Sequence, residues 1–140
     1  MKNREIKFRA WYDSKKEMHF FNLFMVNTKL FENQGGDMIQ YSSIMQFTGL
    51  KDKNGKEVYE GDIVSLTRPV GNWTGRRMTT IHKIYFEEHI CSFVLESTGN
   101  YTKLRKAPFY EYEVLGNIYE NDFEKIKLAV EAVTPNEVQK

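Results

Sequence analysis

Hydrophobic and polar residues alternate along residues 6–12, which places Lys7 and Arg9 on the face opposite Phe8 and its apolar neighbours. A period of two is typical of a strand with one buried face. A polar turn over 13–17 and a second apolar run over 18–26 follow directly. Two such runs joined by a short polar gap predict a β-hairpin at the start of the chain.

The middle of the chain predicts a second hairpin. Residues 27–44 include two adjacent glycines and predict a surface loop. Apolar residues over 44–50 predict a strand, and 56–59 is its expected partner. The turn between them, over 52–55, contains Gly55, which tolerates the positive φ that tight hairpin turns require.

The second half of the chain predicts a small, strongly bent sheet or barrel, because short apolar runs alternate with turn residues. The expected strands begin at Ile63 and cover residues 63–66, 78–88, 91–97, 101–105 and 112–119. A long loop over 68–77 separates the first two strands. Apolar residues spaced three and four apart follow Asp122 and predict a C-terminal amphipathic helix that ends before Pro135.

Composition and charge limit the classes of function. The 140 residues are 41% hydrophobic and 28% charged, as in an ordinary globular protein. Twenty basic and nineteen acidic residues leave a net charge of +1, so binding to nucleic acid would need a local patch. The aromatic content of 14% fits a β core, or alternatively a surface for a partner. Neither a secretory signal nor a membrane span is expected, so no membrane partner is predicted.

Three separate motifs occur in the order expected for one known family. They are Arg4–Trp11, Met45–Val64 and Tyr112–Asn121. On these motifs the chain resembles the YopX family of phage and prophage proteins. The resemblance implies a β protein with an SH3-like barrel in its second half, encoded in a mobile genetic element. It carries no catalytic residues to this sequence.

Pattern and resemblance together predict a mainly β fold. In it, an N-terminal β-hairpin region packs on a small SH3-like β-barrel, with a short C-terminal helix. We expect a single domain over residues 1–140. Its expected parts are the hairpin region over 1–60, the barrel over 61–120, the helix over 121–134 and a frayed tail over 135–140.

Candidates for a metal site or a catalytic thiol surround Cys91, the only cysteine, with His82 and His89 as the nearest imidazoles. No Cys-x-x-Cys or His-x-x-x-His pair occurs, whereas a metal site needs converging ligands. A reactive thiolate needs an electropositive setting, which the acidic residues Glu87 and Glu88 oppose. We therefore expect Cys91 to be buried as a small apolar residue, and we predict no metal, no cofactor and no enzymatic activity.

Four carboxylates lie close together in the middle motif, at Asp52, Glu57, Glu60 and Asp62. Paired carboxylates can serve in catalysis, but each of these lies at a turn or at the end of a strand. Aspartate in such positions accepts hydrogen bonds from backbone N–H groups. We interpret these residues as turn formers.

Basic and aromatic residues alternate in two loops of the second half, and small barrels often bind single-stranded nucleic acid with such a combination. The alternative is that these basic residues are ordinary solvated charges of surface loops with no role in binding. The candidate nucleic-acid-binding residues are Arg68, Trp73, Arg76, Arg77, Lys83, Tyr101, Lys103, Arg105 and Lys106.

Two hypotheses of function follow. The first is a phage or prophage accessory protein that acts as a non-enzymatic protein-binding or self-assembly module. Its exposed strand edges or aromatic surface would pair with a second copy, giving a homo-oligomer, or with a phage or host protein. The alternative is a nucleic-acid-binding small β-barrel that uses the loops at 68–77 and 101–106. In either case we expect a soluble protein in the cytoplasm of the bacterial host.

Overall fold

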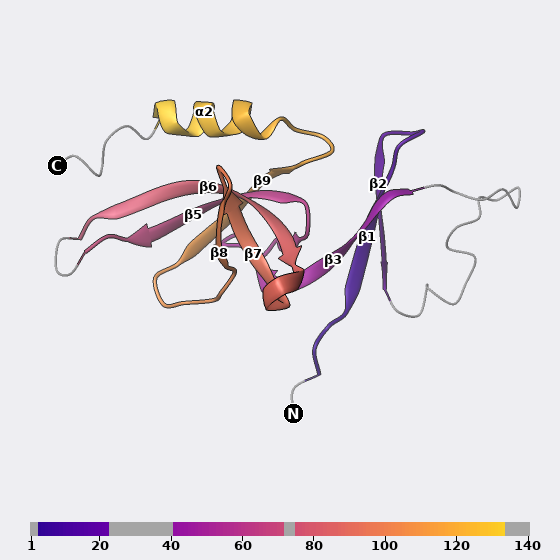
Figure 1. Ribbon diagram of the computed structural model, residues 1–140, viewed down its shortest axis with the longest axis horizontal. Helices are drawn as coiled ribbons and strands as arrows, with labels where there is room; N and C mark the ends of the chain where they lie inside the picture. The colour runs from indigo at the N-terminus through magenta and orange to yellow at the C-terminus, as the bar shows by residue number, and fades with distance from the viewer. Residues whose placement is uncertain (1–2, 23–40, 72–74, 134–140) are drawn as a thin grey trace, which may run out of the picture.

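The computed structural model describes residues 3–22, 41–71 and 75–133, which form two antiparallel sheets and a C-terminal helix (Figure 1). The elements, in chain order, are β1 (Lys7–Tyr12), β2 (Glu17–Asn22), β3 (Tyr41–Lys51), β4 (Glu57–Tyr59), β5 (Asp62–Pro69), β6 (Arg77–Glu87), the 3₁₀ helix η1 (Glu88–Ile90), β7 (Ser92–Ser97), β8 (Asn100–Lys103), β9 (Glu111–Asn117) and α2 (Phe123–Val133).

The first sheet has the strand order β2-β1-β3-β4. Strands β1 and β2 form the predicted N-terminal hairpin, in register from Lys7 opposite Asn22 to Tyr12 opposite Glu17. Strand β3 is longer than predicted and pairs with both β1 and β4. The part of the predicted second strand beyond Asn22 and most of the predicted loop over 27–44 lie outside the described residues.

The second sheet has the order β8-β7-β6-β5-β9 and curls into a half-barrel (Figure 1). The predicted loop over 68–77 is wrong at both ends, because β5 continues to Pro69 and β6 begins at Arg77. Cross-strand pairs extend to Arg68 opposite Met78 and Pro69 opposite Arg77. Proline is tolerated there because it stands at the end of its strand.

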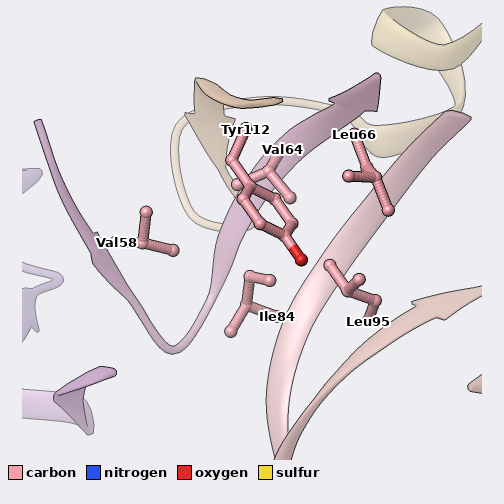
Figure 2. Packing of buried hydrophobic residues seen from close by; sticks show 6 residues of the cluster. All are labelled: Val58, Val64, Leu66, Ile84, Leu95 and Tyr112. Atoms are coloured by element: carbon pink, nitrogen blue, oxygen red, sulfur yellow. The ribbon is translucent and has the colours of Figure 1, made fainter. Parts of the chain in front are cut away.

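The core of the half-barrel lies on its concave face. Strands β4, β5, β6, β7 and β9 each contribute at least one side chain to a cluster in which the members point toward one another (Figure 2). The members are Val58, Val64, Leu66, Ile84, Leu95 and Tyr112. The Tyr112 hydroxyl donates to the main-chain oxygen of Arg105 at 2.7 Å, so its one polar atom is satisfied.

Helix α2 follows the predicted boundaries and lies along β6 (Figure 1). The Asp122 carboxylate accepts from the Lys125 N–H at 3.2 Å and caps its first turn. Lys83 of β6 lies 5.0 Å from the centre of the Phe123 ring. The predicted fold class, mainly β with a curled second sheet and a short helix, is confirmed. The single-domain division stays a prediction.

Candidate functional site

A buried ion pair joins the two sheets. Arg9 of β1 has its Nη2 atom 2.8 Å from an oxygen of Asp62 at the start of β5, and both side chains are nearly inaccessible to solvent. The same Nη2 donates to the main-chain oxygen of Glu60 at 2.9 Å. The guanidinium also lies 4.9 Å from the centre of the Tyr59 ring. Alternation predicted only that Arg9 lies on the face opposite Phe8, and it could not reveal that this charged side chain is buried beside a carboxylate.

Asp62 is held on its second side by the backbone. Its other carboxylate oxygen accepts from the Tyr59 N–H at 2.8 Å. Burial raises the pKa of Asp62, and the Arg9 charge together with the Tyr59 N–H opposes that shift. Burial likewise raises the pKa of Glu60, whose carboxylate accepts from the Gln46 N–H at 2.9 Å. These carboxylates organise the junction between the sheets.

Asp52 makes a second connection between the sheets. One of its oxygens accepts from Asn54 N–H and Lys56 N–H within the β3–β4 turn, at 2.8 and 2.9 Å. The other accepts from Val114 N–H of β9 at 3.0 Å. Burial pushes the pKa of Asp52 upward, but these three N–H donors outweigh it and lower the pKa overall. The interpretation of Asp52 and Asp62 as turn-forming carboxylates is confirmed, and the structure adds their role between sheets.

A cavity of about 420 Å³ opens on the concave face of the half-barrel. It receives side chains from four of the five strands of the sheet and from the segment that follows β8. The described residues that line it include three basic ones and no carboxylate. They are Leu66, Arg68, Thr80, His82, Leu95, Thr102, Lys103, Arg105 and Tyr110. We call this cavity the basic pocket.

Two polar pairs shape the basic pocket. Arg105 donates to the Tyr110 hydroxyl at 3.0 Å and lies over the same ring, 5.5 Å from its centre. That hydrogen bond lowers the pKa of Tyr110. On the other side, His82 Nε2 and the Thr80 hydroxyl are 2.7 Å apart. Burial, followed by the nearby charge of Arg68, lowers the pKa of His82 to about 4, so its ring is neutral near pH 7.

The structure gathers only part of the predicted nucleic-acid-binding set. Arg68, Lys103 and Arg105 line the basic pocket. Arg76 lies in the β5–β6 connection, where its main-chain oxygen accepts from Val70 N–H at 3.0 Å. Arg77, Lys83, Tyr101 and Lys106 do not line the pocket, and Trp73 is not among the described residues.

The four described residues of this group have other contacts in the structure. Arg77 donates to the main-chain oxygen of Phe109 at 3.0 Å and lies 3.8 Å from Glu111. Lys83 pairs with Glu96 at 3.2 Å. Tyr101 makes an edge contact with Tyr85, and Lys106 lines a separate cavity with Lys51 and Arg4. Trp73 lies outside the described residues.

The sequence did not predict Thr80, Thr102 or Tyr110 as pocket residues. Strand alternation places Thr80 and His82 on the same face of β6 as Ile84 of the core. This alternation could have assigned Thr80 to the pocket together with His82. Tyr110 lies outside any strand and carries no such signal.

Strand β8 is an outer edge of the second sheet. Leu104 N–H donates to Phe93 C=O at 2.9 Å, which marks this pair as hydrogen-bonded. Bonded and non-bonded pairs alternate in an antiparallel ladder, so the main-chain groups of Tyr101 and Lys103 point away from β7. Within the described ranges, no strand pairs with them on that outer side.

The predicted burial of Cys91 is wrong. Cys91 is exposed and follows η1 in the left-handed region, with φ +48°. Its Sγ donates to the main-chain oxygen of Glu88 at 3.3 Å. Over the part of the chain that the structure describes, no three His, Cys, Asp or Glu side chains converge on a common point suitable for a metal ion. The described helices include none that is long and apolar enough to cross a lipid bilayer.

Two sheets, a hydrogen-bonded junction between them and a half-barrel with a basic pocket define a mainly β protein. The family model described as YopX protein matches residues 7–123, so the chain belongs to the YopX family. A solved structure similar to this chain is that of protein EF1440 from Enterococcus faecalis, with 28% sequence identity and a TM-score of 0.47. That match covers 85% of this chain and 96% of the other. No curated protein matches the chain.

Proposed function

We propose that this protein is a non-enzymatic binding module that holds an extended segment of another protein by strand addition at β8. The observation that carries the proposal is the outward direction of the main-chain groups of Tyr101 and Lys103. An unpaired strand edge offers a row of donors and acceptors that an extended peptide can complete. Following the phage resemblance of the sequence, the partner would be a phage or host protein in the bacterial cytoplasm.

Charge favours a different protein over a second copy at this edge. Lys103, Arg105 and Lys106 lie within or just after β8. Antiparallel pairing of two β8 strands would bring these like charges together across the new ladder, which is unfavourable. Self-assembly through β8 would appear in light scattering as a dimer, most readily at high salt, which screens these charges. That result would replace the proposal with a homo-oligomer.

The decisive variants differ by one hydrogen-bond donor. Tyr101→Pro removes the outward N–H, whereas Tyr101→Ala removes the side chain and keeps that N–H. Ten-residue peptides selected from a display library on the wild-type protein provide the probes. Their affinity should fall at least tenfold with Tyr101→Pro but stay near the wild-type value with Tyr101→Ala. Equal affinity for both variants would contradict strand addition at β8, provided that circular dichroism shows both to be folded.

A second function is favoured by one observation, the absence of carboxylates among the described residues of the basic pocket. The protein would then bind single-stranded nucleic acid, with phosphates at Arg68 and Arg105. Fluorescence anisotropy with a labelled oligothymidylate should show a salt slope of about 0.7 for each neutralised phosphate. Binding should weaken with Arg68→Gln and Arg105→Gln but not with Lys15→Gln, which changes an exposed turn residue. Anisotropy that stays flat at low salt would exclude this function.

A further inference from the structure

We propose that the basic pocket receives carboxylate side chains of the strand added at β8, so that the partner segment is an acidic, extended peptide. This inference rests on the proposed function, because the peptide must first pair with β8. It adds the chemistry of the partner, which the free edge alone leaves open.

The first argument is the position of the pocket relative to the free edge. Thr102 pairs with Leu95, and both residues line the basic pocket. Thr102 lies between Tyr101 and Lys103, whose main-chain groups point outward. A peptide residue opposite Thr102 would therefore direct its side chain to the same face of the sheet as Thr102. Successive residues on that face, at i and i+2, would reach the mouth of the pocket.

The second argument is the chemistry of the pocket walls. Guanidinium groups from Arg68 and Arg105 enter from β5 and from the segment after β8, and no described lining residue supplies a negative charge. A guanidinium presents paired donors that match a carboxylate geometrically. The Thr102 hydroxyl adds a donor that can also serve a carboxylate oxygen. The walls thus suit one or two carboxylates.

The third argument separates an acidic peptide from a nucleic acid. A single strand needs exposed aromatic faces for stacking, but Arg105 already lies over the Tyr110 ring, and Tyr101 contacts Tyr85 on the opposite face. Residues 61–120 contain seven basic and seven acidic residues, so the half-barrel has no net charge. Two of the remaining candidate cations, Arg77 and Lys83, lie beside carboxylates. A local pocket of this kind suits short acidic segments better than a polyanion.

The experiment uses a pair of matched peptides and the full chain. One ten-residue peptide alternates Glu with Thr, and its partner has Gln at every Glu position. Fluorescence anisotropy should give a dissociation constant at least tenfold lower for the Glu peptide, because only a carboxylate adds its own charge and a bidentate contact to the guanidinium hydrogen bonds. In the variant with Arg68→Gln and Arg105→Gln the two peptides should bind alike. Lys15→Gln should keep the wild-type preference.

The outcomes distinguish this inference from the proposed function. If both peptides bind the wild type equally and Tyr101→Pro weakens both, the acidic preference is wrong while strand addition stands. If the Glu peptide binds but Tyr101→Pro has no effect, the carboxylates bind without strand pairing and both proposals are wrong. If neither peptide binds and an oligothymidylate does, a nucleic acid is the ligand. Binding of none of the three probes overturns both proposals.

Discussion

Replacing Asp62 by alanine should reveal how strongly the buried ion pair holds the two sheets together. The substitution leaves the Arg9 guanidinium without its carboxylate, in a place where its side chain is 6% exposed. It also removes the acceptor of the Tyr59 N–H. Water cannot readily replace these partners, so the free energy of unfolding must fall.

The size of the loss follows from this burial. Breaking a buried ion pair by removing one partner costs about 3–5 kcal/mol, because the other charge stays buried and unpaired. Domains of this size are stable by only about 5–15 kcal/mol. Asp62→Ala is therefore expected to remove a large share of the total stability. By contrast, Lys7→Met breaks the solvent-screened pairs of Lys7 with Glu5 and Glu57 and should cost far less stability than Asp62→Ala.

The opposite substitution, Arg9→Met, should behave differently with pH. It leaves the Asp62 carboxyl, whose pKa burial raises even while Arg9 opposes the shift. A group with a raised pKa in the folded state takes up a proton there before it does in the unfolded chain. The stability deficit of Arg9→Met should therefore shrink as the pH falls from 7 toward 4. The deficit of Asp62→Ala should not shrink over that range, because the guanidinium keeps its charge and the variant lacks the carboxyl whose protonation stabilises the folded wild type.

Urea unfolding of the wild type, both single variants and the double variant measures the coupling directly. The double variant should lose at least about 2 kcal/mol less than the sum of the two single losses, since removal of both charges leaves none unpaired. Additive losses within about 0.5 kcal/mol would refute the idea that Arg9 and Asp62 act as a pair. Equal pH dependence of the two single variants would refute the account of Asp62.

Three other perturbations test other parts of the fold. Burial lowers the pKa of His82 to about 4, so between pH 6.5 and 4 the unfolded chain binds more protons than the folded protein. The free energy of unfolding should therefore fall by about 1–2 kcal/mol as the pH drops through that window, after allowance for solvent screening. Urea titrations should show this loss abolished by His82→Gln and kept by His89→Gln. Asp52→Ala should cost about 1–3 kcal/mol at pH 7 for its three unpaired N–H groups, and the difference from wild type should narrow as the pH drops below about 4, because the pKa of Asp52 is lowered on balance. Gly55→Ala should cost about 1–2 kcal/mol through its φ of +82° alone. Gly61→Ala should melt lower still, since its Cβ would lie 2.8 Å from a methionine sulfur, and identical melting of the two variants would show that this contact is harmless.

Local patterns predicted the elements better than their faces. Alternation and turn residues predicted the hairpin of β1 and β2, most of the half-barrel and α2, because these depend on neighbouring residues. The burial of Arg9 depends on partners more than fifty residues later, and no local pattern encodes that distance. Cys91 was predicted inside because its neighbours are apolar, but the chain turns there and exposes it.

The candidate site was predicted only in part for a related reason. Arg68 and Arg105 are basic residues in expected places, but their convergence depends on how far the second sheet curls. Curvature comes from the twist and pairing of all five strands together. The prediction from sequence included Arg77 and Lys83 in the same set as Arg68 and Arg105. In the structure, strand pairing places Arg77 and Lys83 beside acidic residues.

Gly61 lies in the turn between β4 of the first sheet and β5 of the second, and its own peptide groups bind it to the second half of the chain, donating to Ile84 C=O and accepting from Ile118 N–H. Together with the contacts of Asp52 and Asp62, this arrangement leaves little opportunity for one sheet to open while the other stays closed. Amide hydrogen exchange should reflect this constraint. We expect the Gly61 and Val114 amides to exchange with solvent only when the whole protein unfolds, at the rate of the slowest protons of the core. A binding edge at β8 would then be displayed by a scaffold that unfolds as one unit.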